Sequence, residues 1–154
     1  MLDKINRRII AALIEDGRAS VETISEKIGL SPTPVRRRIK RMEEAGVITG
    51  YSANIDPRAC GLMLTLYTYI SLRSLDPDLI AEFERRVREI PEVQRCELVT
   101  GSYAYVMVLR LANIDKYNQY LRQVISRLPG VSATTTQVVI ETIKDKLNIP
   151  LNDN

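Results

Sequence analysis

The chain has 154 residues, a formal net charge of +3, no histidine and only two cysteines, Cys60 and Cys96. Without histidine it cannot use Ser/His or Cys/His catalysis, and the distant cysteines have no metal-ligand spacing, so we expect free, core-type thiols and no cofactor. No apolar run approaches the roughly 20 residues of a membrane span, and charged residues interrupt the first ten positions, so we expect a cytoplasmic protein without a membrane partner.

Positive charge is concentrated in the first third of the chain. Residues 1–50 carry 10 Lys and Arg against 7 Asp and Glu, whereas residues 51–154 carry 12 of each. Most of the excess comes from the hexamer at residues 36–41, in which five of the six residues are basic. This asymmetry indicates a module that binds a polyanion, joined to a neutral module.

Three helices are expected in the first 50 residues, over about 4–16, 21–28 and 32–45. A residue that can cap a helix N-terminus precedes each of them: Asp3, Ser20 and Ser31. A glycine that can adopt a left-handed conformation follows each of them: Gly17, Gly29 and Gly46. Apolar residues recur every three or four positions, which predicts that the inward faces of the helices pack together.

The second and third helices are joined by residues 29–31, with the spacing of a helix-turn-helix. At about 100° per residue, the third helix has a narrow apolar stripe made of Val35, Ile39 and Met42. Arg38 lies at the edge of this stripe, and the other basic residues lie opposite it. Such a helix suits the major groove of double-stranded DNA, where Arg binds guanine and where Lys and Thr bind phosphates. The residues predicted to contact DNA are Ser31, Thr33, Arg36, Arg37, Lys40 and Arg41. The alternative is a solvated helix face whose charge run is partly neutralised by Glu43 and Glu44.

The rest of the chain is expected to form a linker strand over residues 51–61 and a duplicated βαβ unit over residues 62–154. Strands are predicted over about 62–73, 93–100, 103–111 and 131–144. One helix is expected to start at Asp76-Pro77 and to end before Pro91, and a second to start at Asp115 and to end at Pro129-Gly130. The β-α-β-β-α-β order predicts an α+β fold, a ferredoxin-like domain that follows a helix-turn-helix domain over residues 1–50.

The predicted sheet is apolar on both faces. The strand at 103–111 places one set of side chains on one side, Tyr103, Tyr105, Met107, Leu109 and Leu111, and another set on the other side, Ala104, Val106 and Val108. The two helices cover only one face, so the apolar character of the second face predicts that it is buried against another subunit in a symmetric homodimer. Such a dimer would also pair two recognition helices. The alternative is coverage by the linker strand and the C-terminal tail, which look too short for it.

Three segments carry a specific combination of motifs. They are Leu-Ser-Pro-Thr-Pro-Val at 30–35 with the basic helix, Glu-Ala-Gly-Val-Ile-Thr-Gly-Tyr-Ser-Ala at 44–53, and Thr-Gly-Ser-Tyr at 100–103. Together they resemble the Lrp/AsnC (leucine-responsive, feast/famine) transcriptional regulators over nearly the whole chain. The resemblance implies a bacterial or archaeal DNA-binding regulator whose second domain binds an effector. It also implies homodimers that assemble into tetramers or octamers.

The resemblance also implies an amino-acid effector site close to the turn at Gly101, with the last strand nearby. The predicted residues are Gly101, Ser102, Tyr103, Ala104, Thr134 and Thr136, whose backbone amides and hydroxyls could bind a carboxylate. Family members often have a Gly-Asp-x-Asp-Tyr pattern here, whereas this chain has Ser102 and Ala104, so an ammonium group lacks a carboxylate partner. Asn6 is a second departure, from a common aspartate, and is expected to affect only local packing. An ordinary hairpin turn and strand are the alternative reading.

The sequence therefore predicts a sequence-specific transcriptional regulator of the Lrp/AsnC type that acts at the nucleoid and is modulated by an amino acid or a related small molecule. An amino-acid-handling enzyme is disfavoured, because the chain has no histidine, no paired carboxylates and no phosphate-binding loop. The alternative that remains open is a nucleoid-associated architectural protein that binds DNA without responding to an effector.

Overall fold

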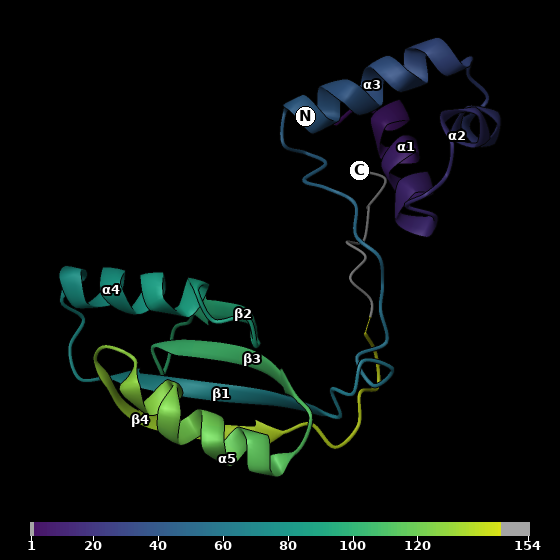
Figure 1. Ribbon diagram of the computed structural model, residues 1–154. Coiled ribbons are helices and arrows are strands. Elements are labelled where there is room, and N and C mark those ends of the chain that lie inside the picture. Colours follow the sequence, from purple (N-terminus) through teal and green to yellow (C-terminus); the bar gives the residue numbers. More distant parts are fainter. Residues whose placement is uncertain (1, 146–154) are drawn as a thin grey trace. The chain divides into compact units, whose positions relative to one another are not determined.

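The computed structural model describes residues 2–145 and shows two compact units (Figure 1). Of the described residues, the first contains residues 2–54 together with Lys144 and Asp145, and the second contains Ile55–Ile143. Residues 146–154, the end of the domain predicted over 62–154, lie outside the described residues. No helix in the described part of the chain is long and apolar enough to cross a membrane.

The first unit consists of three helices, as the sequence predicts. They are α1 (Lys4–Glu15), α2 (Val21–Ile28) and α3 (Pro32–Glu44). The Asp3 carboxylate accepts the backbone amide of Asn6 at the start of α1, and Ser20 accepts that of Thr23 at the start of α2. A small core fixes the packing of the helices; its buried residues are Ile9, Ala12, Ile24, Ile28, Val35 and Met42.

Two details of the helix ends differ from the prediction. Gly17 is not the left-handed stop of α1, because Asp16 already ends the helix in an extended conformation and its carboxylate accepts the amide of Arg18 at 2.8 Å. Ser31 occupies the N-cap position of α3 but makes no side-chain capping bond. A capping oxygen bonds the amide two or three residues on, and the third residue here is Pro34, which has no N–H.

The second unit has the predicted βαββαβ order. Its elements are β1 (Leu64–Leu72), α4 (Pro77–Arg88), β2 (Val93–Leu98), β3 (Tyr105–Leu111), α5 (Ile114–Gln123), the 3₁₀ turn η1 (Ile125–Arg127) and β4 (Val131–Val138). The strands form one antiparallel sheet in the order β2-β3-β1-β4. The fold is therefore a three-helix helix-turn-helix unit followed by a ferredoxin-like unit, which confirms the predicted fold class.

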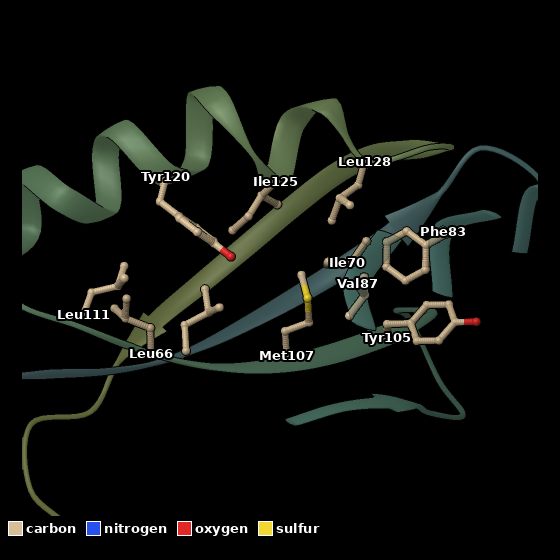
Figure 2. Close-up of a cluster of buried hydrophobic side chains, with 11 residues drawn as sticks. Leu66, Ile70, Phe83, Val87, Tyr105, Met107, Leu111, Tyr120, Ile125 and Leu128 are labelled. Atoms are coloured by element: carbon tan, nitrogen blue, oxygen red, sulfur yellow. The ribbon is translucent and has the colours of Figure 1, made fainter. Parts of the chain in front are cut away.

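Both long helices of the second unit cover the same face of the sheet. The two central strands contribute Leu66, Ile70, Met107 and Leu109 to the core, each of them fully buried. Figure 2 shows how α4 adds Phe83 and Val87, while the segment from α5 onward adds Tyr120, Ile125 and Leu128. The opposite face of the sheet, called the open face below, therefore lies away from the helices.

Several expectations for the second unit need correction. The segment 51–61 forms no strand: residues 51–56 are irregular, and residues 57–61 form a turn in which the amide of Leu62 donates to the carbonyl of Pro57. α5 begins at Ile114, one residue before the predicted start at Asp115, and Asn113 caps it. β3 begins at Tyr105 and β4 ends at Val138, so both strands are shorter than predicted.

Gly130 occupies a position that is restricted both by its backbone and by its neighbour. Its φ is 75°, and an added Cβ would lie 2.6 Å from Cδ2 of Leu79 on α4. Gly61 has a similar φ of 77° but open space around it. At either position, a residue with a side chain is destabilised by about 1–2 kcal/mol because it must adopt the left-handed backbone conformation. Only Gly130 adds a steric cost, typically about 1–3 kcal/mol.

We therefore expect Gly130→Ala to destabilise the full-length protein by about 1–3 kcal/mol more than Gly61→Ala. Urea unfolding followed by circular dichroism measures both variants under the same conditions. An equal loss of stability in the two variants would mean that Leu79 moves aside without cost.

Candidate functional site

The predicted DNA-contact residues all lie on the exposed surface of α3 or at its N-cap. They are Ser31, Thr33, Arg36, Arg37, Lys40 and Arg41. The opposite side of the helix packs on the core: Val35 and Met42 are buried, and Ile39 is half-buried. The structure therefore divides α3 into an apolar face and a basic face, as its helical periodicity predicts.

Weak ion pairs neutralise only part of this basic face. Arg36 lies 3.4 Å from Glu22, and Lys40 lies 3.7 Å from Glu44. All four side chains are between 60% and 75% exposed, so these pairs contribute little stability and separate easily. Within residues 2–145, Arg37 and Arg41 make no hydrogen bond or ion pair, so their guanidinium groups are available to a ligand.

Glu43 forms no ion pair with the basic face among residues 2–145. Its carboxylate accepts a hydrogen bond from the hydroxyl of Tyr51 at 2.9 Å. Partial burial, and then the bonded carboxylate, raise the pKa of Tyr51 above its ordinary value. The hydroxyl therefore stays protonated and keeps donating, which ties the segment after α3 to the end of that helix.

Arg38 has a different role from the other basic residues of the hexamer. One of its guanidinium nitrogens donates to Oδ2 of Asp3, the N-cap of α1, at 2.5 Å and to Oδ1 of Asn6, on the first turn of α1, at 2.9 Å. The backbone amide of Asn6, and then Arg38, hold the pKa of the Asp3 carboxyl below its ordinary value. Asn6 thus contacts α3 directly. The sequence had predicted an effect on local packing only.

The turn at residues 101–104 presents unbonded backbone amides. Gly101 has a φ of 123°, a conformation that favours glycine. The amides of Gly101, Ser102 and Tyr103 have no hydrogen-bond partner among the described residues. Ala104 differs, because its amide donates to Ile70 and its carbonyl accepts from Val99. The turn could therefore bind an anion through its first three residues but not through the backbone of Ala104.

The structure brings Thr135, and not Thr134 or Thr136, next to this turn. The hydroxyl of Tyr103 donates to Thr135 Oγ1 at 3.3 Å, and its ring centroid lies 5.1 Å from that of Tyr69. This places Tyr103 with the residues of the open face. The sequence had predicted that it would share a side with Tyr105.

The two threonines predicted from the sequence belong to the opposite, helix-covered face. Thr134 pairs across the sheet with Ile70, and Thr136 pairs with Thr68, both of which are fully buried. The Thr136 hydroxyl already bonds that of Thr68 at 2.9 Å. Successive side chains of a strand point to opposite faces, so residues 134 and 136 cannot share the side that Thr135 occupies.

The open face of the sheet has an apolar centre. Tyr67 of β1 is 41% exposed, and its direct neighbour on β3, Val108, is half-buried. Tyr69 and Val106 form the next pair along the same two strands. Charged and polar residues flank this centre on the edge strands, among them Arg95 and Gln137. The face is thus apolar in the middle and polar at its rim.

A groove of about 560 Å³ lies at the other end of β3, on the helix-covered side. Its lining includes Ile90, Arg110, Lys116 and Tyr120. The Tyr120 hydroxyl is buried there without a hydrogen-bond partner among residues 2–145, and burial followed by the charge of Glu92 raises its pKa. None of the predicted effector residues lines this groove, so it is separate from the 101–104 turn.

The Cys96 thiol is held in its unreactive, protonated form. Burial, and then the charges of Glu84 and Glu97, raise the pKa of Cys96 to about 11, which keeps it protonated. Cys60 is exposed, so the expectation of a core-type thiol holds only for half-buried Cys96. Within the described residues, no group of three or more metal-ligating side chains could hold a metal ion.

Comparison with protein families matches both units of this chain. Residues 2–43 match the AsnC-type helix-turn-helix domain, and residues 65–149 match the Lrp/AsnC ligand binding domain. The chain belongs to the Lrp/AsnC family. It is therefore a DNA-binding transcriptional regulator with a ligand-binding domain, and not an enzyme.

Individual Lrp/AsnC relatives match over nearly the whole chain. The leucine-responsive regulatory protein of Escherichia coli is 38% identical over 143 residues, which cover 93% of this chain and 87% of that protein. A transcriptional regulator of Neisseria meningitidis in complex with L-methionine has 30% identity and a TM-score of 0.94, with 99% and 98% of the two chains covered. The feast or famine regulatory protein of Mycobacterium tuberculosis, complexed with L-methionine, has 32% identity and a TM-score of 0.88, with 97% and 99% covered.

Proposed function

We propose that α3 enters the major groove of double-stranded DNA and reads its operator through the basic face. The contact residues are Ser31, Thr33, Arg36, Arg37, Lys40 and Arg41. The observation that carries this assignment is the state of Arg37 and Arg41, which are exposed and unpaired within residues 2–145. Arg binds guanine bidentately, while Lys and Thr bind phosphates, so one face supplies both base reading and positioning.

We assign sequence-specific regulation, rather than uniform DNA coating, to this Lrp/AsnC chain. Selection of bound duplexes from a random library, followed by footprinting of the enriched sequence, tests the assignment. A protected site of defined sequence is expected. Uniform protection with no enriched sequence would instead support the nucleoid-associated architectural protein.

We further assign the open face of the sheet to a homodimer interface. Its centre, formed around Tyr67 and Val108, is apolar and lies on the side away from both helices. A patch of this kind is typical of interfaces, and a two-fold axis through it lets each copy bury the same residues. Two copies also supply two recognition helices for adjacent major grooves. Further assembly of such dimers gives the tetramer or octamer.

The proposed division of labour follows the chain order. Residues 1–50 bind DNA, residues 51–61 connect the modules, and residues 62–154 bind the effector and oligomerise. Because its target is chromosomal DNA, we place the protein in the cytoplasm, at the nucleoid.

For the effector we propose an amino acid bound at the 101–104 turn. The unbonded amides of Gly101, Ser102 and Tyr103 can hold its carboxylate, and the hydroxyl pair of Tyr103 and Thr135 borders the same turn. Of the threonines, Thr135 takes the place of Thr134 and Thr136 in this assignment. L-Methionine is the first candidate, because two similar regulators were solved with it.

The carboxylate and the ammonium of the amino acid should contribute unequally to its binding affinity. The turn offers amides to the carboxylate, whereas Ser102 and Ala104 offer the ammonium no acidic side chain. Hydrogen bonds to a charged group contribute about 1.5–3 kcal/mol, so we expect methioninol, which lacks the carboxylate, to bind at least about 10-fold more weakly than L-methionine. N-acetylmethionine, which lacks the ammonium, should stay within a few-fold.

Isothermal titration of the full-length protein with the three compounds measures this order. The reverse order would place the ammonium, and not the carboxylate, at the recognition point. No binding of L-methionine or of any other common amino acid would remove the effector assignment while leaving DNA binding untouched.

A further inference from the structure

We propose that Arg38 is a positioning residue for operator recognition: it fixes the rotation of α3 on α1 and does not itself contact DNA. The inference rests on the proposed role of α3 in reading DNA. It concerns Arg38 because this is the one basic residue of the hexamer that is only half-exposed and turned away from the basic face.

The contacts of Arg38 cross between two helices. A single guanidinium nitrogen bonds Asp3 Oδ2 at 2.5 Å and Asn6 Oδ1 at 2.9 Å, which are 35 and 32 residues away in the sequence. The Arg38 side chain is 29% exposed, whereas that of Arg36, which points outward, is 69% exposed. Arg38 is thus turned toward the first turn of α1.

The two acceptors are held in place by each other. Asp3 uses one carboxylate oxygen to accept the backbone amide of Asn6 at 2.7 Å and the other to accept Arg38. Asn6 uses its backbone as a donor to Asp3 and its side-chain oxygen as an acceptor from Arg38. The three residues form a closed set, called the Arg38 clamp below. Because its acceptors belong to a capped helix end, the clamp has little freedom to shift.

The Arg38 clamp lies close, around the helix axis, to the side chains that rotation of α3 would move on the DNA. At about 100° per residue, Arg37 and Arg41 lie about 100° and 60° from Arg38 around the helix axis. Base-reading side chains must be held to within roughly 0.5 Å of their productive geometry. The apolar stripe of α3 is narrow, with two buried residues and a half-buried one, and the Arg38 bonds add a directional contact at its edge.

A role in orientation fits these contacts better than a role in stability. The Asp3 side chain is 52% exposed, so solvent screens the ion pair and its contribution to folding is small. Loss of the clamp should therefore leave the unit folded with α3 less well oriented. Specific reading of bases suffers from such a change, whereas non-specific attraction to phosphates depends on charge and hardly changes.

The test compares Arg38→Gln and Asp3→Asn with Arg37→Ala in the full-length protein. Asparagine caps a helix as well as aspartate does, so Asp3→Asn removes the charged partner of Arg38 and keeps α1 intact. Each protein is titrated, over a range of salt concentrations, with a duplex selected by the unmodified protein from a random library and with a random-sequence duplex. Thermal unfolding confirms that each variant is folded.

For both clamp variants we expect affinity for the selected duplex to fall roughly 10-fold, with affinity for random duplex and the salt dependence of binding changed little. Arg37→Ala should instead lower the slope of log K against log salt by about one if its partner is a phosphate, or relax sequence preference if it is a base. A slope reduced by about one in Arg38→Gln but not in Asp3→Asn would overturn the inference, because Arg38 would then contact DNA itself. Unchanged affinity in both clamp variants would overturn it too. If Arg37→Ala also has no effect on either duplex, the proposed role of α3 fails as well.

Discussion

Replacing both Arg37 and Arg41 with alanine is expected to lower affinity for the operator on the order of 100-fold, since each direct arginine contact contributes about 1–3 kcal/mol. These two side chains are the strongest candidates because they are exposed and, within residues 2–145, unpaired. Arg36 and Lys40 must first separate from Glu22 and Glu44, which offsets part of any gain from DNA. Fluorescence anisotropy with a selected duplex measures the loss.

The matched control removes the same two charges elsewhere. Arg86 and Arg88 lie on α4, where they pair with Glu82 and Glu84. Their replacement with alanine should leave operator affinity within about 2-fold, because both arginines lie outside the proposed recognition helix and already pair with carboxylates of their own helix. An equal loss in the control pair would mean that net charge, and not the basic face of α3, drives binding.

The packed and exposed faces of α3 could be predicted from the sequence because the helical repeat of apolar residues is a local feature of the chain. The spacing of Val35, Ile39 and Met42 identifies the packed face, and the exposed residues follow from it. The position of Arg38 at the edge of the stripe was also correct. Its partners could not be predicted, because Asp3 and Asn6 are more than 30 residues away and only the packing of α1 on α3 brings them near.

The proposed effector turn shows a different limit of prediction from sequence. Its residues were predicted by resemblance, together with Thr134 and Thr136, which the structure places away from the turn. A run of three threonines has no apolar alternation, so nothing in it indicates which members face the helices. The register of β4 against β1 decides this, and a shift by one residue exchanges the two faces.

Segment 51–61 was misread for a related reason. It follows a helix and carries extended-favouring residues, but a strand exists only where a neighbouring strand accepts its hydrogen bonds. In the described chain the sheet is complete with β2 and β4 at its edges, and residues 57–61 close a turn on themselves. Composition alone does not report the presence or absence of a pairing partner.

The second large effect is expected on the open face of the sheet. Tyr67→Glu should convert the assembled protein to a single chain at micromolar concentration. Tyr67 is already 41% exposed in one chain, so the substitution costs the isolated unit little. At a two-fold interface the same change buries an unpaired carboxylate from each copy, and one such charge alone costs about 3–5 kcal/mol. Size-exclusion chromatography with light scattering measures the mass.

A control for this prediction lies on the other side of the sheet. Asn118 is exposed on α5, away from the open face, so Asn118→Glu adds the same charge and should leave the mass unchanged. If Tyr67→Glu keeps the mass of the unmodified protein, the open face is not an interface between subunits.

The same variant links assembly to DNA binding. Two recognition helices held by one dimer bind two half-sites together, because after the first contact the second is intramolecular and occurs at a high effective concentration. Tyr67→Glu should therefore weaken binding to a two-half-site duplex at least about 100-fold, while binding to a single half-site changes little. Arg37→Ala should weaken both. This difference separates the surface that joins the subunits from the one that reads DNA, and a parallel loss on both duplexes would show that Tyr67 affects the helices themselves.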